Sequence, residues 1–385
     1  MSALQDRLVD ITRQSQWEQP EILKLTNDAD ANRLDELVSH NKIANVYDPA
    51  EVISSELYEF HNPGVVLDDD SLRDLATTNK EDEAFGSWVY YPWSRDLVRF
   101  PDANDYHDLR TSRYRNLLTE DEIRKLTLAR PAIFGLSVGS NIATALTRNS
   151  IGGEILLGDV ASEKTSNIGR ATIDIRDTLT DKVDAVAKQI SYIDPYMRQT
   201  HFHDGINEDS IECLRAFNPT IIGDEVDDMR ASALLREFSR DNHIAYVNVS
   251  DVHDTIVAEV CRHDLGYAPL YAGRVKDSEA KRAIEGGMSE KEQQELFIRT
   301  VGYTSLSPRL VSSGLEIGRT LGGIPQLGST AIAGAGIATV LFRDISLSKT
   351  YVKTGITRSR LSPKAYPLDE LVDVGCRYLR YMHDA

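Results

Sequence analysis

A strand–turn–helix–strand pattern in residues 132–159 constrains the fold more than any other feature of the sequence. It consists, in order, of a short apolar segment (132–134), a turn of small residues (135–140), a helical pattern with one apolar face (141–149), and a second apolar segment (154–158) closed by Asp159. A βαβ unit of about thirty residues places two parallel strands side by side through a right-handed crossover. The chain therefore contains a parallel sheet with helices packed on it.

The alternation of strands and helices continues beyond this unit. Helical spacing recurs at 183–190, a strand at 220–223 ends at Asp224, a helix follows at 231–240, and another strand at 244–249. Such alternation predicts an α/β fold, a Rossmann-like, doubly wound and mostly parallel sheet. Exposed helices at 274–298 read as an insertion, and an apolar helix rich in Gly and Ala at 324–345 closes the domain.

The first 108 residues have a different character. They contain short helical patterns at 34–38 and 51–60, an acidic triplet that starts a further helix at Asp68, an aromatic strand or hairpin at 86–93, and a polar linker at 100–106. We therefore expect a smaller α+β accessory domain in 1–108, an α/β domain in 109–346 with an insertion at about 266–310, and a carboxy-terminal extension in 347–385. Substrate binding is a candidate role for the first of these.

Composition argues against several functional classes. The chain has 385 residues with 60 acidic and 43 basic side chains, so its formal charge of −17 repels nucleic-acid backbones. It has no apolar stretch long enough for a membrane span and no secretory signal. Its three cysteines, Cys213, Cys261 and Cys376, are too few and too scattered for a disulfide framework or a paired zinc site. We expect a cytoplasmic protein.

The turn at 135–140 and Asp159 point to a nucleotide. Small residues between a strand and a helix let backbone N–H groups and the positive helix end approach a phosphate. The G-x-G-x-x-G frame falls on Gly135, Ser137 and Ser140, with Gly139 one position early, which alone is a weak match. Asp159, at the end of the second strand, could accept both ribose hydroxyls. A purely structural turn is the alternative, and neither feature identifies the nucleotide.

The cations after Asp159 discriminate between nucleotides. Ser166 and Asn167 are followed by Arg170, and Lys182 opens the next helix. A dehydrogenase needs no cation here, whereas a triphosphate with about four negative charges needs several donors. Arg170 or Lys182 alone would be interpreted as an ordinary charged residue on the solvated surface.

Carboxylates form a third element, in the segment 224–228. Asp224, Glu225, Asp227 and Asp228 directly follow a strand, and the carboxyl ends of parallel strands face the crevice where α/β proteins bind ligands. One of these carboxylates could hold the Mg²⁺ that bridges phosphate oxygens. The alternative is an ordinary acidic surface loop.

In this order the motifs resemble those of the ThiF and MoeB adenylyltransferases and the related ubiquitin-activating enzymes. The matching residues are Gly135–Ser140, then Asp159, Ser166, Asn167 and Arg170, then Lys182, then Asp224, Asp227 and Asp228. Two further segments are similar: Arg110–Arg113 to the family's R-Y-x-R motif, and Gly323–Gly328 to the start of its late helix. The resemblance spans roughly residues 108–346.

The resemblance implies an enzyme that joins ATP to a carboxylate and releases pyrophosphate. It implies these roles: Gly135, Ser137 and Gly139 at the phosphates; Asp159 at the ribose; Asn167, Arg170 and Lys182 at the triphosphate; Asp227 at Mg²⁺; and Arg113 acting across a homodimer interface, with Arg110 and Arg115 as nearby alternatives. The substrate would be the carboxyl terminus of a peptide or small protein, or a small carboxylic acid. In microcin-type relatives an extra amino-terminal domain grips the peptide, which is the model for residues 1–108.

The chain departs from this family in its cysteines. Many members carry two C-x-x-C pairs for zinc, and this sequence has none. Members that form a thioester need a reactive cysteine, but the candidate, Cys261, ends an apolar segment at 255–261 and reads as a buried small residue. Two other functions remain open: a nicotinamide- or flavin-dependent oxidoreductase with the same Rossmann unit, and a nucleotide-binding scaffold without catalysis.

Overall fold

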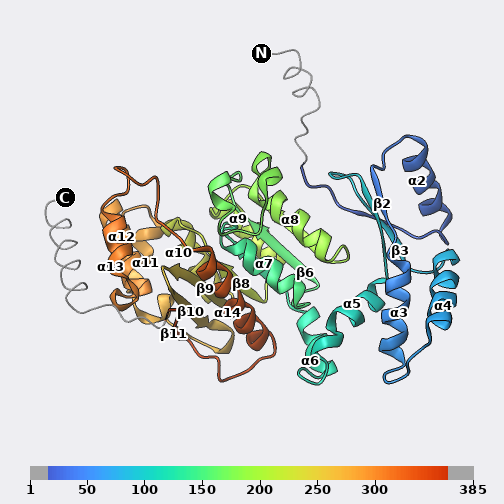
Figure 1. The fold of residues 1–385 in the computed structure, drawn as a ribbon. Coiled ribbons are helices and arrows are strands. Elements are labelled where there is room, and N and C mark those ends of the chain that lie inside the picture. The colour runs from blue at the N-terminus through green and yellow to red at the C-terminus, as the bar shows by residue number, and fades with distance from the viewer. Residues whose placement is uncertain (1–15, 363–385) are drawn as a thin grey trace, which may run out of the picture.

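The computed structural model describes residues 16–362 and contains two sheets in that range (Figure 1). One has four strands in the order β1-β3-β4-β2, and the other has seven in the order β11-β10-β9-β8-β5-β6-β7. The smaller sheet belongs to an amino-terminal lobe and the larger one to the main body of the molecule. The predictions for residues 1–15 and for 363–385, Cys376 included, lie outside the described residues.

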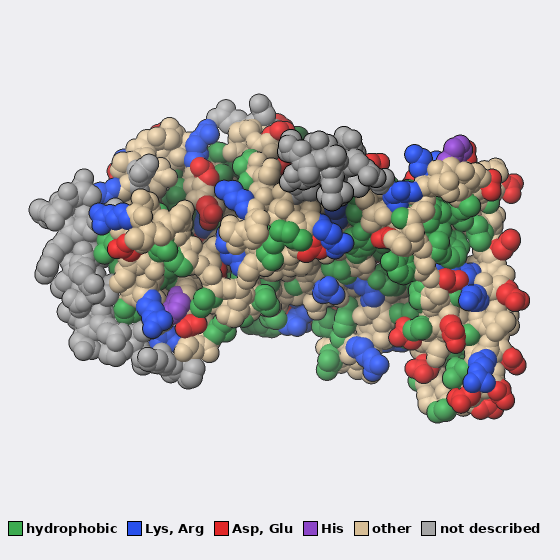
Figure 2. Space-filling view, turned by 45° about the horizontal axis from the view of Figure 1, so that its top comes forward, with side chains coloured by type: hydrophobic (Ala, Val, Ile, Leu, Met, Phe, Trp, Pro, Cys, Tyr) green, Lys and Arg blue, Asp and Glu red, His purple; other side chains and the backbone are tan. Residues whose placement is uncertain are grey.

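The amino-terminal lobe combines the small sheet with three helices. Its elements are β1 (Glu21–Leu23), α2 (Asp28–Ser39), β2 (Asn45–Tyr47), α3 (Ala50–His61), α4 (Asp69–Glu81), β3 (Ser87–Tyr91) and β4 (Asp96–Phe100). The predicted helix start at the acidic triplet is confirmed, because Asp68 accepts a hydrogen bond from the Ser71 N–H and caps α4. In the space-filling view acidic side chains gather along the outer edge of this lobe (Figure 2).

The segment after β4 is not the linker that its polar residues predict. Helix α5 (Ala103–Thr111) begins two residues after Pro101 and leads through η1 (Ser112–Tyr114) to α6 (Glu120–Thr127). The Tyr106 hydroxyl donates to the Ile193 carbonyl oxygen at 2.6 Å, and the Tyr196 hydroxyl donates to the Pro101 carbonyl oxygen at 2.7 Å. These hydrogen bonds hold the segment against the body, so the polar residues start a packed helix.

The body confirms the predicted doubly wound α/β fold. Its strands are β5 (Pro131–Phe134), β6 (Glu154–Gly158), β7 (Arg198–Phe202), β8 (Ile221–Asp224), β9 (Ala245–Val252), β10 (Thr255–Arg262) and β11 (Gly355–Arg360). Strands β5 to β9 pair in parallel, and β10 and β11 extend the sheet antiparallel. The carboxyl ends of five strands therefore meet at one edge of the sheet.

Helices cover both faces of this sheet. They are α7 (Gly139–Arg148), α8 (Lys182–Ile193), α9 (Glu208–Phe217), α10 (Met229–Asp241) and α14 (Gly328–Ser346). Side chains alternate along a strand, so Ile133 packs with α7, α8 and α14, whereas Ala132 and Phe134 pack with α9 and α10. The closing helix begins at Gly328, four residues later than its apolar pattern predicts.

Short helices connect β10 to α14 and fill the predicted insertion. They are η4 (His263–Leu265), η5 (Leu270–Gly273), α11 (Asp277–Ile284), α12 (Glu290–Val301), η6 (Tyr303–Ser305) and α13 (Pro308–Gly314), while η2 (Thr165–Asn167) and η3 (Ile175–Leu179) lie between β6 and α8. The insertion buries its own apolar cluster, including Tyr271, Ala280 and Leu296, and is therefore packed rather than fully exposed. Among the described residues, none of the helices combines the length and apolar character that a membrane crossing requires.

Candidate functional site

The turn between β5 and α7 is shaped by Gly135. This residue has φ +82°, and a Cβ atom here would lie 2.3 Å from the Glu225 carbonyl oxygen, so only glycine fits. The turn consequently rests against the segment that follows β8. The residue before α7, Val138, supplies no side-chain cap, which leaves the positive end of a ten-residue helix facing this edge of the sheet.

Asp159 links this turn to Lys182. One carboxylate oxygen accepts the Leu136 N–H at 2.7 Å and lies 3.3 Å from the Lys182 Nζ, and the other accepts the Ala161 N–H at 2.9 Å. Both side chains are largely buried, with 8% and 14% of their surfaces exposed. The carboxylate and the cation that the sequence places 23 residues apart are thus in direct contact.

The loop that carries Asn167 and Arg170 is clamped between two helix starts. On one side, the Asn141 side chain at the start of α7 donates to the Arg170 carbonyl oxygen at 2.6 Å. On the other side, a Cβ atom on Gly328 at the start of α14 would lie 2.1 Å from the Gly169 carbonyl oxygen. Asn167 is buried and donates to Glu163 at 3.0 Å. The backbone around Arg170 is therefore fixed without using its guanidinium.

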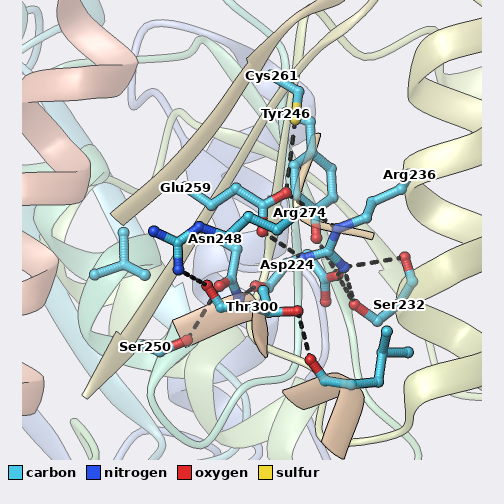
Figure 3. A network of polar contacts seen from close by, with 12 residues as sticks. Asp224, Ser232, Arg236, Tyr246, Asn248, Ser250, Glu259, Cys261, Arg274 and Thr300 are labelled. Atoms are coloured by element: carbon cyan, nitrogen blue, oxygen red, sulfur yellow. Dashed lines mark hydrogen bonds and ion pairs between the residues drawn. The ribbon is translucent and has the colours of Figure 1, made fainter. Parts of the chain in front are cut away.

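Asp224, the first acidic residue after β8, serves the core. It is fully buried, and one of its oxygens accepts hydrogen bonds from the hydroxyls of Ser232 and Tyr246 and pairs with Arg236 at 3.3 Å (Figure 3). Its other oxygen accepts the Val226 N–H at 3.0 Å. Both carboxylate oxygens of Asp224 are thus engaged by the protein itself.

Two of the other acidic residues of this segment, Asp228 and Glu225, also have hydrogen-bond partners in the protein, and Asp227 does not. Asp228 caps α10 by accepting the Ala231 N–H at 2.7 Å, and Glu225 accepts the Val249 N–H at 2.9 Å. Asp227 makes no hydrogen bond or ion pair within residues 16–362. Although Asp227 is solvent-exposed, desolvation by the surrounding protein raises its pKa, and the charges of Lys182 and Arg170 oppose that rise. Of the acidic run, Asp227 is thus the carboxylate without a protein partner in the described residues, and it lies within electrostatic reach of both cations.

Two acidic residues at this site were missed by the sequence analysis. Asp251 lies at the carboxyl end of β9, where it accepts the Gln326 side-chain N–H at 2.9 Å, and burial raises its pKa to about 6. Glu163 precedes Asn167, and burial raises its pKa as well. Asp251 could have been found, because the rule that placed Asp227 after β8 applies equally to the next parallel strand.

Several buried polar atoms at this edge have no hydrogen-bond partner among the described residues. They are Ser137 Oγ, Glu163 Oε1, Arg170 Nε and Asp251 Oδ2. Buried polar atoms in native proteins are nearly always paired. A group of unpaired donors and acceptors near Lys182 and Asp227 is typical of a site whose partners arrive with a polar ligand.

The three candidate arginines before α6 have different surroundings. Arg110 donates to Asp194 at 2.5 Å and to the Thr147 carbonyl oxygen, and Arg115 pairs with Glu120 at 3.2 Å. Arg113 is exposed, and in the described part of the chain it makes no hydrogen bond or ion pair. The structure therefore leaves Arg113 available to another molecule and engages the other two within the chain.

Cys261 lies in β10 as a buried thiol. Its Sγ atom lies 3.6 Å from a Glu259 oxygen, and burial, followed by the Glu259 charge, raises its pKa. A raised pKa keeps the sulfur protonated and unreactive at neutral pH. This agrees with its interpretation as a small core residue.

Comparison with known proteins gives distant relatives. No protein-family model matches the chain. The uncharacterized protein MT1398 of Mycobacterium tuberculosis (strain CDC 1551 / Oshkosh) is 27% identical over 285 residues, which cover 74% of this chain and 39% of that protein. The chain thus spans less than half the length of this curated relative.

The solved structures that are similar to the chain include TcdA, MccB and PaaA. The tRNA N6-threonylcarbamoyladenosine dehydratase TcdA of E. coli in complex with ATP is 19% identical with a TM-score of 0.46, covering 65% of this chain and 98% of that one. E. coli MccB with ATP is 12% identical with a TM-score of 0.44, covering 81% and 88%. PaaA is 15% identical with a TM-score of 0.45, covering 90% and 100%.

Proposed function

We propose that this chain is an ATP- and Mg²⁺-dependent adenylyltransferase of the ThiF and MoeB type that acts on a carboxylate. The observation that carries the proposal is that Lys182, through Asp159, and Arg170, through Asn141, are held at the uncapped start of α7, with Asp227 within electrostatic reach of both. A triphosphate needs cations, backbone N–H groups and a carboxylate for its metal ion, and this edge of the sheet offers all three.

The proposed reaction needs no nucleophile from the protein. An oxygen of the substrate carboxylate attacks the α-phosphorus of ATP, the bond to the bridging oxygen breaks, and pyrophosphate leaves with the electron pair. Lys182 and Arg170 offset the charge that develops on the phosphates, and stabilisation of this kind supplies much of the rate enhancement of many enzymes. Asp159 would hold the ribose, and Asn167, by bonding Glu163, supports the loop that presents Arg170.

Asp227 fits the role of magnesium ligand. Carboxylate oxygens are preferred ligands of Mg²⁺, and those of Asp227 have no protein partner in the described chain. Bound there, the ion would supply charge neutralisation on the phosphate oxygens. Asp224 is unsuited to that role because the core already uses its oxygens.

The experiment is ATP–pyrophosphate exchange with labelled pyrophosphate and a panel of carboxylates. The panel should pair each peptide carrying a free carboxyl terminus with its amidated form, because only the free acid can form an acyl adenylate. Carboxylate-dependent exchange supports the proposal. Nucleotide binding without exchange would favour the scaffold, and a cofactor-dependent absorbance change would favour the oxidoreductase.

The residue-level test is Asp227→Ala, with Asp241→Ala as the matched control. Asp241 is an exposed aspartate at the end of α10, outside the site. We expect exchange to fall by at least about 10²-fold in the first variant and to persist in the second. Normal exchange in a folded Asp227→Ala protein would remove Asp227 from the mechanism.

A further inference from the structure

A second cluster of possible ligands lies at the edge strand β7. His201 belongs to β7 and His203 directly follows it, so their two-residue spacing points both rings to the same side. Asp184 approaches from α8, which covers this strand. One ligand atom from each of the three residues lies within 4.8 Å of the others. None of the three has a part in the proposed ATP site.

The ring of His201 is oriented by a neighbouring amide. Its Nε2 lies 3.2 Å from the Gln199 side-chain oxygen. The amide of Gln199 cannot be reversed without loss, because its nitrogen donates to the Ser191 hydroxyl at 3.0 Å and to the Ala187 carbonyl oxygen at 3.3 Å. The oxygen therefore faces His201 and selects the tautomer with hydrogen on Nε2. This leaves a lone pair on Nδ1, the arrangement found for histidines that bind metals.

Asp184 is oriented in a similar way. One of its oxygens accepts the backbone N–H of Trp17 at 3.3 Å, and the other lies 3.9 Å from the His203 Nε2. The second separation is too long for a hydrogen bond. It is close to the distance of about 3.3 Å between two ligands of one tetrahedral zinc ion with metal–ligand bonds of about 2.0 Å.

We propose that Asp184, His201 and His203 bind a divalent transition-metal ion, with Zn²⁺ as the expected species. Two imidazoles and one carboxylate suit zinc and not magnesium, so the site is chemically distinct from the one at Asp227. His203 has 42% of its side chain exposed, which leaves a coordination position open to water.

A metal ion at this position would link several segments of the chain. The ion would join strand β7 to helix α8, which begins at Lys182. It would also hold the segment before β1, because the Trp17 ring packs edge-on against His201 with centroids 4.3 Å apart. Metal binding would therefore stabilise the packing of three segments that are distant in sequence.

The test uses the full chain without an affinity tag of histidines, freed of metal by a chelator and titrated with Zn²⁺ by calorimetry. His203→Ala is the main variant because an exposed side chain can be removed without unfolding the protein, and His40→Ala, at an exposed histidine at the end of α2, is the matched control. We expect one Zn²⁺ per chain in the wild type and in His40→Ala, and an affinity at least about tenfold weaker in His203→Ala. The thermal midpoint should rise with Zn²⁺ in the first two proteins and not in the third.

A second measurement reports on the place of binding. Co²⁺ bound beside Trp17 should quench tryptophan fluorescence in the wild type, and Trp17→Phe should lose that quenching although Trp88 and Trp93 remain. Equal Zn²⁺ affinity in the wild type and His203→Ala would overturn the proposal. So would the absence of zinc binding by the wild type, which would leave an ordinary ion pair between Asp184 and His203.

Discussion

At the scale of single residues, Lys182 has carboxylate neighbours in the nucleotide-free site and would bind phosphate oxygens in the proposed reaction. Its ammonium group contacts Asp159 at 3.3 Å and acts on Asp227 through its charge. In the absence of nucleotide it is thus paired with Asp159 and lies within electrostatic reach of Asp227. A triphosphate offers it stronger, doubly charged partners in the same place.

We predict that Lys182→Ala lowers kcat/KM for ATP–pyrophosphate exchange by about 10²–10³-fold, because one charged donor to the phosphates is lost. The matched control is Lys164→Ala, which removes an exposed lysine from the same connection between β6 and α8. We expect this variant to keep nearly full activity. Equal losses in both variants would mean that general surface charge, and not the position of Lys182, governs the exchange.

The raised pKa of Asp251, an acidic residue of the site, leads to a prediction about how stability depends on pH. Burial raises the pKa of Asp251 to about 6 from a reference value of 3.8. Between these two values the folded protein binds more protons than the unfolded chain, so the free energy of unfolding falls as the pH rises through this interval. Above about pH 6 the carboxylate is charged in both states and its full destabilising effect is present.

We therefore predict that Asp251→Asn, measured without nucleotide, is more stable than the wild type at about pH 8 by about 1–3 kcal/mol. The new amide keeps an oxygen for the Gln326 hydrogen bond and carries no charge. The difference should shrink towards zero at about pH 4. Urea unfolding at both pH values measures it, and Asp241→Asn, at an exposed position, should show less than about 0.5 kcal/mol at either pH. A pH-independent difference for Asp251→Asn would contradict the assignment.

At the scale of elements, a buried ion-pair network joins helix α10 to three strands. Arg236 in α10 lies between Asp224 of β8 and Glu259 of β10, with the Tyr246 ring of β9 beside it (Figure 3). All four side chains are almost fully buried. Removing the cation would leave two carboxylates uncompensated inside the protein, which costs far more than breaking an exposed pair.

We predict that Arg236→Met lowers the free energy of unfolding by about 3–5 kcal/mol. The matched control is Arg240→Met, one turn later on the same helix, where the ion pairs with Glu237 and Asp277 are solvated. That change should cost less than about 1 kcal/mol. Urea titration followed by circular dichroism compares the two, and similar costs would show that the network contributes no special stability.

The sequence predicts elements better than it predicts the roles of neighbouring residues. The βαβ unit, the sheet and the helices could be derived because apolar periodicity reflects burial directly. The sequence does not show which carboxylate of 224–228 is left without a protein partner. That depends on the pairing of Asp224 with Arg236 and on the capping of α10 by Asp228, and both contacts are set by tertiary structure. The same limit applies to the arginines, since nothing in the spacing of Arg110 shows that it pairs with Asp194. The helix at 103–111 was missed because its first turn is made of residues that also favour loops.

At the scale of the whole molecule, the amino-terminal lobe is in contact with the helix that carries Lys182. The last residues of α8 accept hydrogen bonds from the lobe and its connecting helix: Ser191 from Tyr91, Tyr192 from Trp93, and Ile193 from Tyr106. Helix α8 therefore has one end at the proposed ATP site and the other against the lobe. If the lobe binds a peptide substrate, the role that the sequence resemblance implies for it, this helix is the physical connection between the two sites.

The exposure of Arg113 leads to a prediction about assembly. An arginine that makes no hydrogen bond or ion pair within the described part of its own chain can complete the site of a second copy, provided that the protein forms a two-fold dimer. Arg113→Ala and Asp227→Ala should then each be inactive alone. Mixing equal amounts, with subunits free to exchange, makes half of the dimers mixed, and each mixed dimer has one intact site. Activity should return to about a quarter of the wild-type value.

The control is Arg115→Ala, which removes a side chain that pairs with Glu120, and this variant should remain active by itself. Because recovery requires one subunit to supply Arg113 and the other Asp227, a mixture that stays inactive while dimers exchange would rule out action of Arg113 across the interface.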